Sequence, residues 1–574
     1  MKKNLFFLLL LQVFTGQISA QTVALGFTAP DTVCVNQTFT IQNTSVGNIS
    51  TNHWSFCIGN TNGVPTATNL SNPANQLYYP VYYSIAKQGS NYYAFVCNNA
   101  TWELVRLSYG NSLLNTPTVT NLGNLGIMLS GLEDLHLEYE NGNWYGIMVG
   151  GSLSGTICRL SFGASLANTP TAVNMGNIGN LSYPQRLQIF WSGGNCYGFT
   201  PNRNGSTLTR FDFGNSITNT PTGLNLGNIG SFNTCDDISI INYNGNWYGY
   251  VVNEDDNSIT RLDFGNSLLN IPTGVNLGNT GALDGPRGID VFVECGEIRG
   301  LIVNRFSDDL LKMNFTAGPT GPIITTTYGN IGNFSFPHSI ERFRVGNTLY
   351  AMIPNVNNAT LTRIEYPGCT SASPASSSLQ NPPSITYNTP GTYYMNYIVN
   401  EGTISQSSLC KKIEVINGPV LSAPSKTICR GQSTVLSVTG AQSYSWSTNQ
   451  TTSMIQVAPL VSTIYTVQGW NGSSCKSNLT VPVTVLICEG LEEYSAGSAF
   501  VISPNPAKDQ IEIQTETKAE KLKIQILDCT GKLIYSGRHT SDSPIDVSWL
   551  RPAMYFLTIE SIDHQLVHKK FIKE

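Results

Sequence analysis

The sequence has few charged residues and no helical periodicity in its central region. It also has no long hydrophobic run after the one near its N-terminus. Only 12% of the 574 residues are charged, and the net charge is -5. Nucleic acid and anionic lipid are bound through clustered lysine and arginine, so neither is expected as a partner. After the first twenty residues, no stretch approaches the ~18 apolar residues of a membrane-spanning helix. A transmembrane helix is therefore not expected in the mature chain.

The sequence also lacks the motifs of several enzyme and metal-site classes. It has no G-x-S-x-G elbow, H-E-x-x-H helix, P-loop or sialidase-type Asp box. None of the thirteen cysteines forms a CxxC pair, which argues against zinc. The acidic segment 253–258, NEDDNS, lacks the ligand order and the distal glutamate of a calcium loop. No cofactor is expected, and calcium at this segment is the one metal that the sequence leaves open.

Residues 1–20 have the pattern of a secretory signal peptide. Two lysines are followed by an apolar run through Leu11 and by the small residues Ser19 and Ala20. Cysteines of an exported chain can be oxidised. The spacing of the cysteines suggests three disulfides: Cys34 with Cys410, Cys57 with Cys369, and Cys429 with Cys475.

Residues 58–368 contain an internal repeat. The position of the glycine in NWYG recurs after 52, 52, 51, 51 and 51 residues, at Ala94, Gly146, Gly198, Gly249, Gly300 and Ala351. Fixed periods of this size indicate a solenoid or a propeller. Each unit contains four short stretches typical of strands, and an Asn-Gly hairpin turn joins the first two.

The two ends of the repeat region predict a closed ring. The first unit opens with VPTATNLSN, and the last unit stops at LTRIEYPG without a fourth strand of its own. The N-terminal strand can complete the last unit, which removes two exposed sheet edges. We predict an all-β chain in which residues 58–368 form a six-bladed β-propeller with four-stranded blades, the N-terminal strand closing the last blade.

The segments on either side of the repeats resemble the two halves of one PKD domain, a small β-sandwich of surface proteins. The resemblance rests on Trp54 and Phe56 in residues 21–57 and on YNTPGTYYMNYIV in residues 369–418. The usual Gly-Asp-Gly after Trp-x-Phe is replaced by CIGN. The resemblance implies that the propeller is inserted into this sandwich, with Cys57 and Cys369 at the neck of the insertion.

Residues 419–488 resemble the Ig-like repeats of bacterial surface proteins. Cys429, Trp446, the TIYTV stretch and Cys475 carry the resemblance. Such modules act as spacers, and residues 489–499 are expected to be a linker to the last domain.

Residues 500–574 resemble the type A C-terminal sorting domain of the type IX secretion system of Bacteroidota. The positions that match are Pro504, Asn505, Pro506, Gly531, Ile545, Asp546, Leu550, Tyr555 and Lys573. Ala553 stands where that family usually has glycine. The resemblance implies a β-sandwich that is recognised by the type IX secretion machinery, export across the outer membrane, removal of the domain, and attachment at the cell surface or release.

Candidate ligand residues lie at positions of the repeat where the residue type differs from one repeat to the next. Ligands of propellers bind over the central channel, on the face formed by the blade-to-blade loops and the loops between second and third strands. One position of the repeat on this face holds Val81, Glu133, Gln185, Asp236, Arg287 and His338. The next position holds Tyr82, Asp134, Arg186, Asp237, Gly288 and Ser339. The second loop adds Arg203, Glu254, Asp255, Asp256, Arg305, Asp308 and Asp309.

Two interpretations of these charges are open: solvated charges of an ordinary loop rim, or a ligand site of mixed polarity suited to a glycan or peptide. The residues predicted for such a site are Glu133, Asp134, Arg186, Asp236, Asp237, Arg287, His338, Glu254 and Asp255. Paired carboxylates also suit glycoside hydrolysis. However, Asp236 and Asp237 are adjacent on a strand and point to opposite faces, so they do not form such a pair. No catalytic residue is assigned.

A basic residue recurs once per unit, at Arg106, Arg159, Arg210, Arg261, Lys312 and Arg363. This regularity predicts a structural role between neighbouring blades rather than phosphate binding. The leading hypothesis for function is a secreted, cell-surface-displayed adhesion or binding protein whose propeller recognises a glycan or a surface protein. The alternatives are an extracellular carbohydrate-active enzyme with rim carboxylates and a structural surface component.

Overall fold

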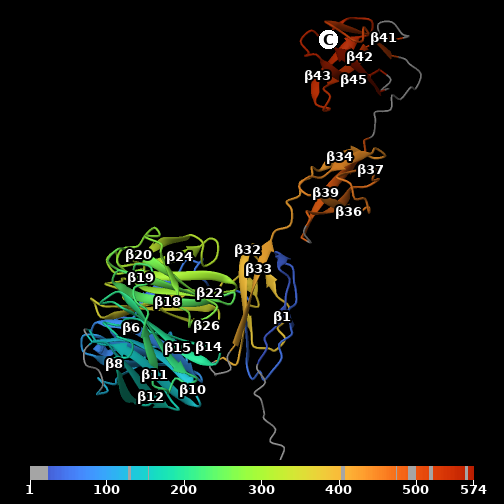
Figure 1. Cartoon of the computed structure of the whole chain (residues 1–574). Coiled ribbons are helices and arrows are strands. Elements are labelled where there is room, and N and C mark those ends of the chain that lie inside the picture. The colour runs from blue at the N-terminus through green and yellow to red at the C-terminus, as the bar shows by residue number, and fades with distance from the viewer. Residues whose placement is uncertain are drawn as a thin grey trace, which may run out of the picture. The chain divides into compact units, whose positions relative to one another are not determined.

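The computed structural model describes residues 23–126, 131–152, 154–401, 407–472, 475–488, 500–515, 521–562 and 566–574. The predicted signal peptide and the linker 489–499 lie outside these residues. The described chain is all-β, with one short helix, η1 (Pro73–Asn75). It divides into two units: residues 1–419 with 470–476, and residues 420–469 with 477–574 (Figure 1).

Six four-stranded antiparallel sheets follow one another along the first unit. We number these repeat sheets one to six. Sheet one has β6 (Pro80–Gln88), β7 (Asn91–Asn98), β8 (Glu103–Gly110) and β9 (Thr118–Asn121). Sheet two has β10 (Leu132–Glu140), β11 (Asn143–Gly150), β12 (Thr156–Gly163) and β13 (Thr171–Gly176). Sheet three has β14 (Gln188–Ser192), β15 (Asn195–Asn202), β16 (Thr207–Gly214) and β17 (Thr222–Asn225).

The remaining three sheets keep the same strand order. Sheet four has β18 (Cys235–Tyr243), β19 (Asn246–Asn253), β20 (Ser258–Gly265) and β21 (Thr273–Asn276). Sheet five has β22 (Pro286–Glu294), β23 (Glu297–Asn304), β24 (Asp309–Phe315) and β25 (Ile323–Gly329). Sheet six has β26 (Glu341–Val345), β27 (Thr348–Asn355) and β28 (Thr360–Tyr366), and its fourth strand is β5 (Thr66–Asn69). The strand that precedes the repeats therefore completes the last sheet.

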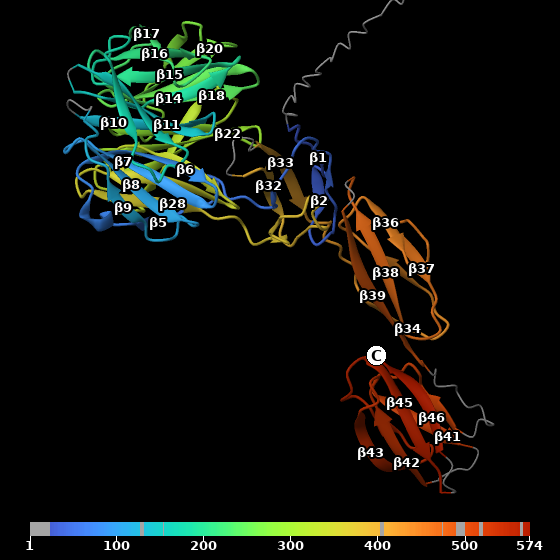
Figure 2. The same ribbon diagram turned by 90° about the horizontal axis from the view of Figure 1, so that it is seen from below.

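Apolar side chains fill the space between neighbouring repeat sheets. Each of six buried clusters draws its residues mainly from two sheets that follow one another. One of them joins Tyr83 and Leu107 of sheet one to Tyr350 and Leu361 of sheet six. The first and last sheets thus pack on each other, and the arrangement is propeller-like (Figure 2).

The recurring basic residues connect each repeat sheet to the next. The Arg106 guanidinium donates to the carbonyl oxygens of Leu166 and Asn168, each at 3.0 Å, in the turn before β13. The same contact recurs from sheet to sheet, and Arg363 of sheet six donates to the carbonyl of Leu113 in sheet one at 3.0 Å. The other arginine contacts are Arg159 to Thr218, Arg210 to Leu268 and Leu269, and Arg261 to Thr320. Lys312 donates instead to the side-chain Oδ1 of Asn62 at 2.6 Å. The predicted structural role of these residues is confirmed.

Strands from before and after the repeats form one five-stranded sheet, which we call the flanking sheet. Its order is β2 (Thr32–Cys34), β33 (Ser407–Ile416), β32 (Gly391–Val399), β4 (Asn52–Ser55) and β30 (Ser376–Ser377). Two small sheets pair β1 (Phe27–Thr28) with β3 (Gln42–Asn43) and β29 (Ala372–Ser373) with β31 (Thr386–Tyr387). Trp54 of β4 is fully buried and stacks on Tyr397 of β32, with ring centroids 3.7 Å apart.

Four disulfides connect the described cysteines, and only one of the three expected pairs is among them. Cys57 and Cys369 are joined, as expected. The expected pairs Cys34–Cys410 and Cys429–Cys475 are wrong: the other bonds are Cys34–Cys475, Cys295–Cys410 and Cys429–Cys488. Strand register explains the last pair. β34 (Lys426–Cys429) runs parallel to β39 (Lys476–Leu486) with Cys429 opposite Leu486, so Cys488 lies nearby and Cys475 precedes the other end of β39.

The second unit contains two separate apolar cores. Around Trp446, one sheet has the order β34, β39, β38 (Thr463–Trp470) and β36 (Ser443–Trp446), and β35 (Thr434–Ser437) pairs with β37 (Met454–Val457). The C-terminal part has β40 (Phe500–Ser503), β41 (Gln510–Thr515) and β44 (Ile545–Asp546) in one sheet. The other has β43 (Leu533–Thr540), β42 (Lys521–Leu527), β45 (Ala553–Glu560) and β46 (Leu566–Lys573).

Candidate functional site

The charged residues at the start of the inner strands are buried rather than solvated. Glu133 and Asp236 are at most 1% exposed, and Arg287 and His338 are each 5% exposed. The interpretation as solvated rim charges is therefore wrong for these residues. Glu133, Asp236 and Arg287 lie at the start of the first strands of sheets two, four and five, and His338 lies three residues before the first strand of sheet six. These strands are the innermost ones, so side chains at one position of the repeat face each other. Asp255, by contrast, is exposed, and it accepts a hydrogen bond from the Thr234 hydroxyl at 2.5 Å.

Arg287 is the centre of a buried charge network that connects sheets three to six. Its Nη1 contacts Asp236 Oδ1 at 2.8 Å and Glu254 Oε2 at 2.6 Å. Its Nε donates to His338 Nε2 at 3.0 Å. Burial, followed by the neighbouring Arg287 guanidinium, holds the pKa of His338 well below its ordinary value, so this imidazole is neutral and can accept the bond.

Two further arginines complete the charge network at its partly exposed edge. Arg203 contacts both Asp236 and Glu254, and Arg305 Nη1 contacts Glu254 Oε1 at 2.7 Å. Burial alone would raise the pKa of Glu254, but Arg287, the hydrogen bond with Asp236, and Arg203 and Arg305 lower it to about 2. Glu254 is therefore ionised. Sequence reasoning had placed these residues on two separate loops, and the structure brings them together.

Three carboxyl groups at this end of the inner strands have a raised pKa: Glu133 beside the charge network, Asp236 within it, and Asp237 next to it in sequence, whose pKa burial raises to about 8. Burial raises the pKa of Glu133 to about 8 and that of Asp236 to about 7. Glu133 Oε1 accepts a hydrogen bond from Asn99 Nδ2 at 2.6 Å. Within the described residues, Glu133 Oε2, Asp236 Oδ2 and His338 Nδ1 have no hydrogen-bond partner.

Asp134 and Asp237 have a structural role, because each joins its own repeat sheet to the next one. Each accepts a hydrogen bond from the backbone of the following residue and a second from the next repeat sheet. Asp134 Oδ2 accepts from Leu187 N at 2.8 Å, and Asp237 Oδ2 accepts from Ile289 N at 3.1 Å. Arg186 contacts Asp134 at 3.6 Å and Glu341 at 2.9 Å. Backbone bonds and ion pairs thus occupy these three predicted ligand residues.

Three other acidic residues of the second loop accept hydrogen bonds within their turns or from neighbouring segments. Asp256 accepts from the Ser258 hydroxyl at 2.7 Å, and Asp308 accepts from Phe336 N at 2.6 Å. Asp309 accepts from Asn304 at 2.9 Å and from Thr327 at 2.5 Å. No group of three or more His, Cys, Asp and Glu that could hold a metal occurs in the described part of the chain.

An unpredicted feature surrounds this end of the inner strands. Two residues before the repeat position of Glu133, the backbone is left-handed in all six repeats, with φ between 53° and 65°: Tyr79, Gly131, Tyr183, Thr234, Gly285 and Phe336. A non-glycine residue in this conformation costs about 1 kcal/mol or more. Because two repeats have glycine here, the turn itself does not require an aromatic side chain. The recurring pairs Tyr-Pro and Phe-Pro were the available sequence signal.

Phe306 supplies an aromatic ring where the fifth repeat has glycine. A Cβ at Gly285 would lie 2.4 Å from the Phe306 ring, so the ring occupies the place of the missing side chain. The Arg305 guanidinium stacks on Phe336 at 3.8 Å from the ring centroid. Phe306 is 57% exposed and Tyr79 is 40% exposed. We call Tyr79, Tyr183, Phe306 and Phe336 the collar, and Arg305 connects the collar to the charge network.

The predicted sorting residues stabilise the C-terminal sheets. Asn505 Nδ2 donates to the Lys570 carbonyl at 3.1 Å, and its Oδ1 accepts from Ile572 N at 2.8 Å. Tyr555 is buried and stacks on Phe571. The remaining positions are Pro504 and Pro506 before β41, Gly531 with φ 84° before β43, Asp546, which accepts from Ser548 N, and the buried Lys573.

Comparison with known proteins identifies this last region. Residues 501–574 match the family described as secretion system C-terminal sorting domain. No curated protein matches the chain in sequence. An auxiliary nutrient binding protein from Bacteroides thetaiotaomicron is similar in structure, with 11% identity, a TM-score of 0.38, and coverage of 60% of this chain and 98% of its own. A GH43_1 enzyme from Xanthomonas citri complexed with xylotriose has 11% identity, a TM-score of 0.32, and coverage of 44% and 93%.

The export route follows from the sorting domain. Among the described residues, no helix has the length and apolar character needed to cross a membrane. The C-terminal sheets form a domain recognised by the type IX secretion machinery, and the chain carries four disulfides, as suits an oxidising compartment. The protein is exported by the type IX secretion system and is a secreted, cell-surface protein.

Proposed function

We propose that the protein is a surface-displayed binding protein whose head is a six-bladed propeller inserted into a PKD-like sandwich. An Ig-like module serves as spacer, and the C-terminal domain directs export. Three observations support the six-bladed head: the six repeat sheets, the apolar cluster between sheets six and one, and the chain of basic contacts that returns to Leu113.

Binding is favoured over catalysis because most of the candidate carboxylates are engaged. Asp236 and Glu254 contact Arg203 and Arg287, and Asp134 accepts backbone hydrogen bonds. The residues at the surface of this end are aromatic side chains and the edge of Arg305. This is the single observation that carries the proposal: aromatic residues are kept at strained positions, above a charge network that fixes Arg305.

The ligand proposed for the collar is a glycan or another surface protein. Aromatic rings stack on the apolar faces of sugars, and tyrosine and arginine are the residue types that contribute most at protein interfaces. The charge network holds Arg305 through Glu254, so its guanidinium stays in place over Phe336. Predicted ligand residues such as Arg287 and His338 act in this proposal as supports rather than as contacts.

The test is binding by the full mature chain. It is measured on a glycan array, and on whole bacterial cells that display surface proteins. Phe306→Ala and Arg305→Gln should each weaken binding at least tenfold. Trp191→Ala is the matched control, since Trp191 is also 40% exposed but lies at the opposite end of an inner strand. Equal loss in the control, or unchanged binding by both collar variants, would contradict the proposal.

The raised pKa values of Glu133 and Asp236 favour one alternative, a carbohydrate-active enzyme. A polysaccharide-hydrolysis screen separates the two functions. Release of product by the wild-type chain that disappears in Glu133→Gln or Asp236→Asn would establish catalysis. If neither binding nor hydrolysis occurs, the structural role in the surface layer is the remaining hypothesis.

A further inference from the structure

A second recess lies at the other end of the repeat sheets, where they meet the flanking sheet. It is a cavity of about 1060 Å³. The first-to-second strand turns of sheets one, two and five form one wall, together with residues 342–344 of β26. β32 and β33 of the flanking sheet form the other wall, through residues such as Ile398 and Ser408. Its volume slightly exceeds the range of about 300–1,000 Å³ typical of ligand pockets.

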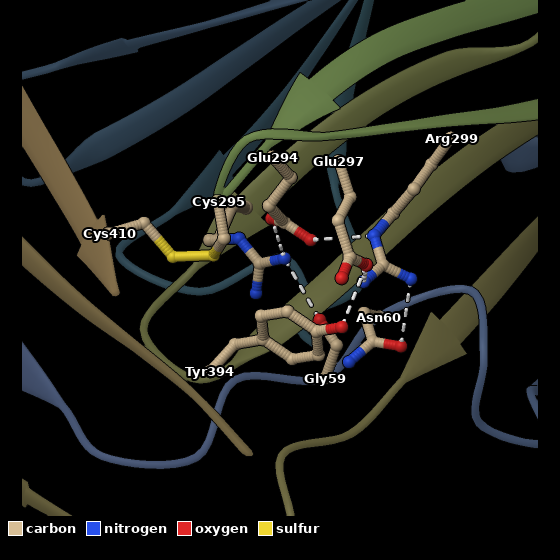
Figure 3. Close-up of a disulfide and its surroundings, with 9 residues drawn as sticks. Gly59, Asn60, Glu294, Cys295, Glu297, Arg299, Tyr394 and Cys410 are labelled. Atoms are coloured by element: carbon tan, nitrogen blue, oxygen red, sulfur yellow. Dashed lines mark hydrogen bonds and ion pairs between the residues drawn. A yellow bond between two sulfur atoms is a disulfide. The ribbon is translucent and has the colours of Figure 1, made fainter. Parts of the chain in front are cut away.

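Covalent and polar contacts fix the two walls to each other. The Cys295–Cys410 disulfide joins the β22–β23 turn to β33 (Figure 3). Beside it, Tyr394 donates to Glu297 Oε2 at 2.7 Å, and the Arg299 guanidinium lies 4.9 Å from the centroid of the Tyr394 ring. Lys87 and Glu401 form an ion pair at 3.1 Å. The cavity is therefore preformed, which lowers the entropic cost of binding a ligand there.

The charged side chains that line the cavity neutralise one another. Arg344 is paired with Glu294 and donates to the Gly59 carbonyl at 2.9 Å. Arg342 is paired with Asp290 at 2.8 Å, and Lys87 with Glu401. A charged ligand would have to compete with these pairs. A neutral ligand with many hydroxyl groups can add hydrogen bonds to the outer oxygen and nitrogen atoms without breaking them.

Aromatic rings give the cavity a surface suited to flat apolar faces. The Tyr139 and Trp144 rings lie on the β10–β11 turn, with centroids 5.0 Å apart and planes inclined by 54°. Phe343 and the 39% exposed Val293 lie elsewhere in the lining. Rings of sugars present C–H groups that pack on such aromatic faces while their hydroxyls reach polar neighbours.

We propose that this cavity is a binding site for a neutral oligosaccharide, separate from the collar. A charged peptide fits less well, because the charges that line the cavity are already paired. The proposal does not depend on the function of the collar, because the two sites lie at opposite ends of the inner strands.

The experiment uses the full mature chain and three probes: xylohexaose, a sulfated hexasaccharide and a neutral hexapeptide. Titration calorimetry should detect xylohexaose alone. Trp144→Ala should raise its dissociation constant at least tenfold, and Ser408→Trp, which fills the cavity from β33, should abolish binding. The matched control is Trp247→Ala: Trp247 has the same place in its repeat, within the same NGNWYG segment, but packs on Phe190 and is not part of the cavity wall.

The outcomes are separable. Binding of xylohexaose that survives in Phe306→Ala but is lost in Trp144→Ala supports this site whatever the collar binds. Failure of the wild-type chain to bind xylohexaose, equal effects of Trp144→Ala and Trp247→Ala, or preferential binding of the peptide or the sulfated probe would each overturn the proposal. Circular dichroism of every variant verifies that the sheets remain folded.

Discussion

Two sets of arginines in the repeat sheets differ in the acceptors that their guanidinium groups contact. The recurring arginines, such as Arg106 and Arg210, donate to backbone carbonyls in the turn of the next sheet. The non-recurring arginines Arg203, Arg287 and Arg305 instead contact carboxylates inside the ring. A carbonyl is present in every repeat whatever the sequence, whereas a carboxylate must be encoded each time. Arginines that recur in the repeats therefore connect the sheets, and arginines that occur in single repeats form the charge network at one end of the inner strands.

The largest expected effect is the removal of Arg287 from the charge network. In Arg287→Met, Asp236 and Glu254 lose the more buried of their two shared arginine partners while they stay buried. Breaking a buried ion pair from one side costs about 3–5 kcal/mol of unfolding free energy. Chemical denaturation followed by tryptophan fluorescence measures the change. A loss below about 1 kcal/mol would mean that Arg203 alone balances both carboxylates.

The second effect is a dependence of stability on pH. The pKa of Glu133 is raised to about 8 from its ordinary 4.5, so between these values the folded state binds a proton that the unfolded state has lost. Stability from this group is present below about pH 4.5 and falls by about 1.4 kcal/mol per unit as the pH rises towards 8. Glu133→Gln should reduce this decline by up to about 1.4 kcal/mol per pH unit, as measured by denaturation at pH 5, 6, 7 and 8. The slope that remains comes from Asp236 and Asp237, because burial raises their pKa values to about 7 and about 8.

Glu254 provides a control of opposite sign for the pH experiment. Its pKa of about 2 lies below the ordinary 4.5, so its contribution to stability is present above pH 4.5 and is lost as the pH falls towards 2. Glu254→Gln should therefore alter the acid side of the profile and leave the slope between pH 5 and 8 in place. A slope that persists unchanged in Glu133→Gln would assign it to another group.

A smaller effect is expected at a recurring arginine. Arg106→Met removes the donor to the carbonyls of Leu166, Ala167 and Asn168. We expect a loss of about 1–2 kcal/mol. Arg210→Met should behave alike, and the double variant should be additive because the two contacts lie in different sheets. Non-additivity would show that the frame couples sheets one and three.

The smallest effect concerns the collar. Tyr79 has φ 56° and is 40% exposed, so Tyr79→Gly relieves backbone strain and removes few contacts. The melting temperature should stay unchanged or rise slightly, with a gain of up to about 1 kcal/mol offset by lost packing. Ligand binding at the collar should weaken in the same variant. A clear loss of stability would instead make Tyr79 a packing residue.

Much of the architecture of the repeat sheets was predictable, because the same sequence pattern occurs six times in the chain. The period gave the number of units, the Asn-Gly segments gave the hairpins, and Arg106 and its counterparts indicated contacts between units. The closing strand β5 followed from the missing fourth strand of the last unit. Each of these features depends on local patterns, which a single sequence contains.

The candidate site was predicted only in part. Position in the repeat placed Asp236 and Arg287 at the same end of the inner strands, and the structure shows them in contact. Their burial was not predicted, because it depends on how the inner strands of different sheets converge. Phe306 could not be assigned to the collar, since its ring replaces the absent side chain of Gly285, twenty-one residues earlier. The partner of Cys410 was missed for a similar reason: Cys295 lies on a turn that only the folded head brings to β33.

The disulfide between Cys57 and Cys369 has a consequence for the order of folding. Its two Cα atoms are 5.5 Å apart, although 312 positions separate them in the chain. Closing a loop costs entropy that grows only with the logarithm of its length. Once the ring is complete, its ends lie together and act as one very large hairpin turn. β4 and β32 then meet as neighbours, so the flanking sheet is expected to assemble last, and exchanging the whole ring for another with adjacent ends would leave that sheet intact.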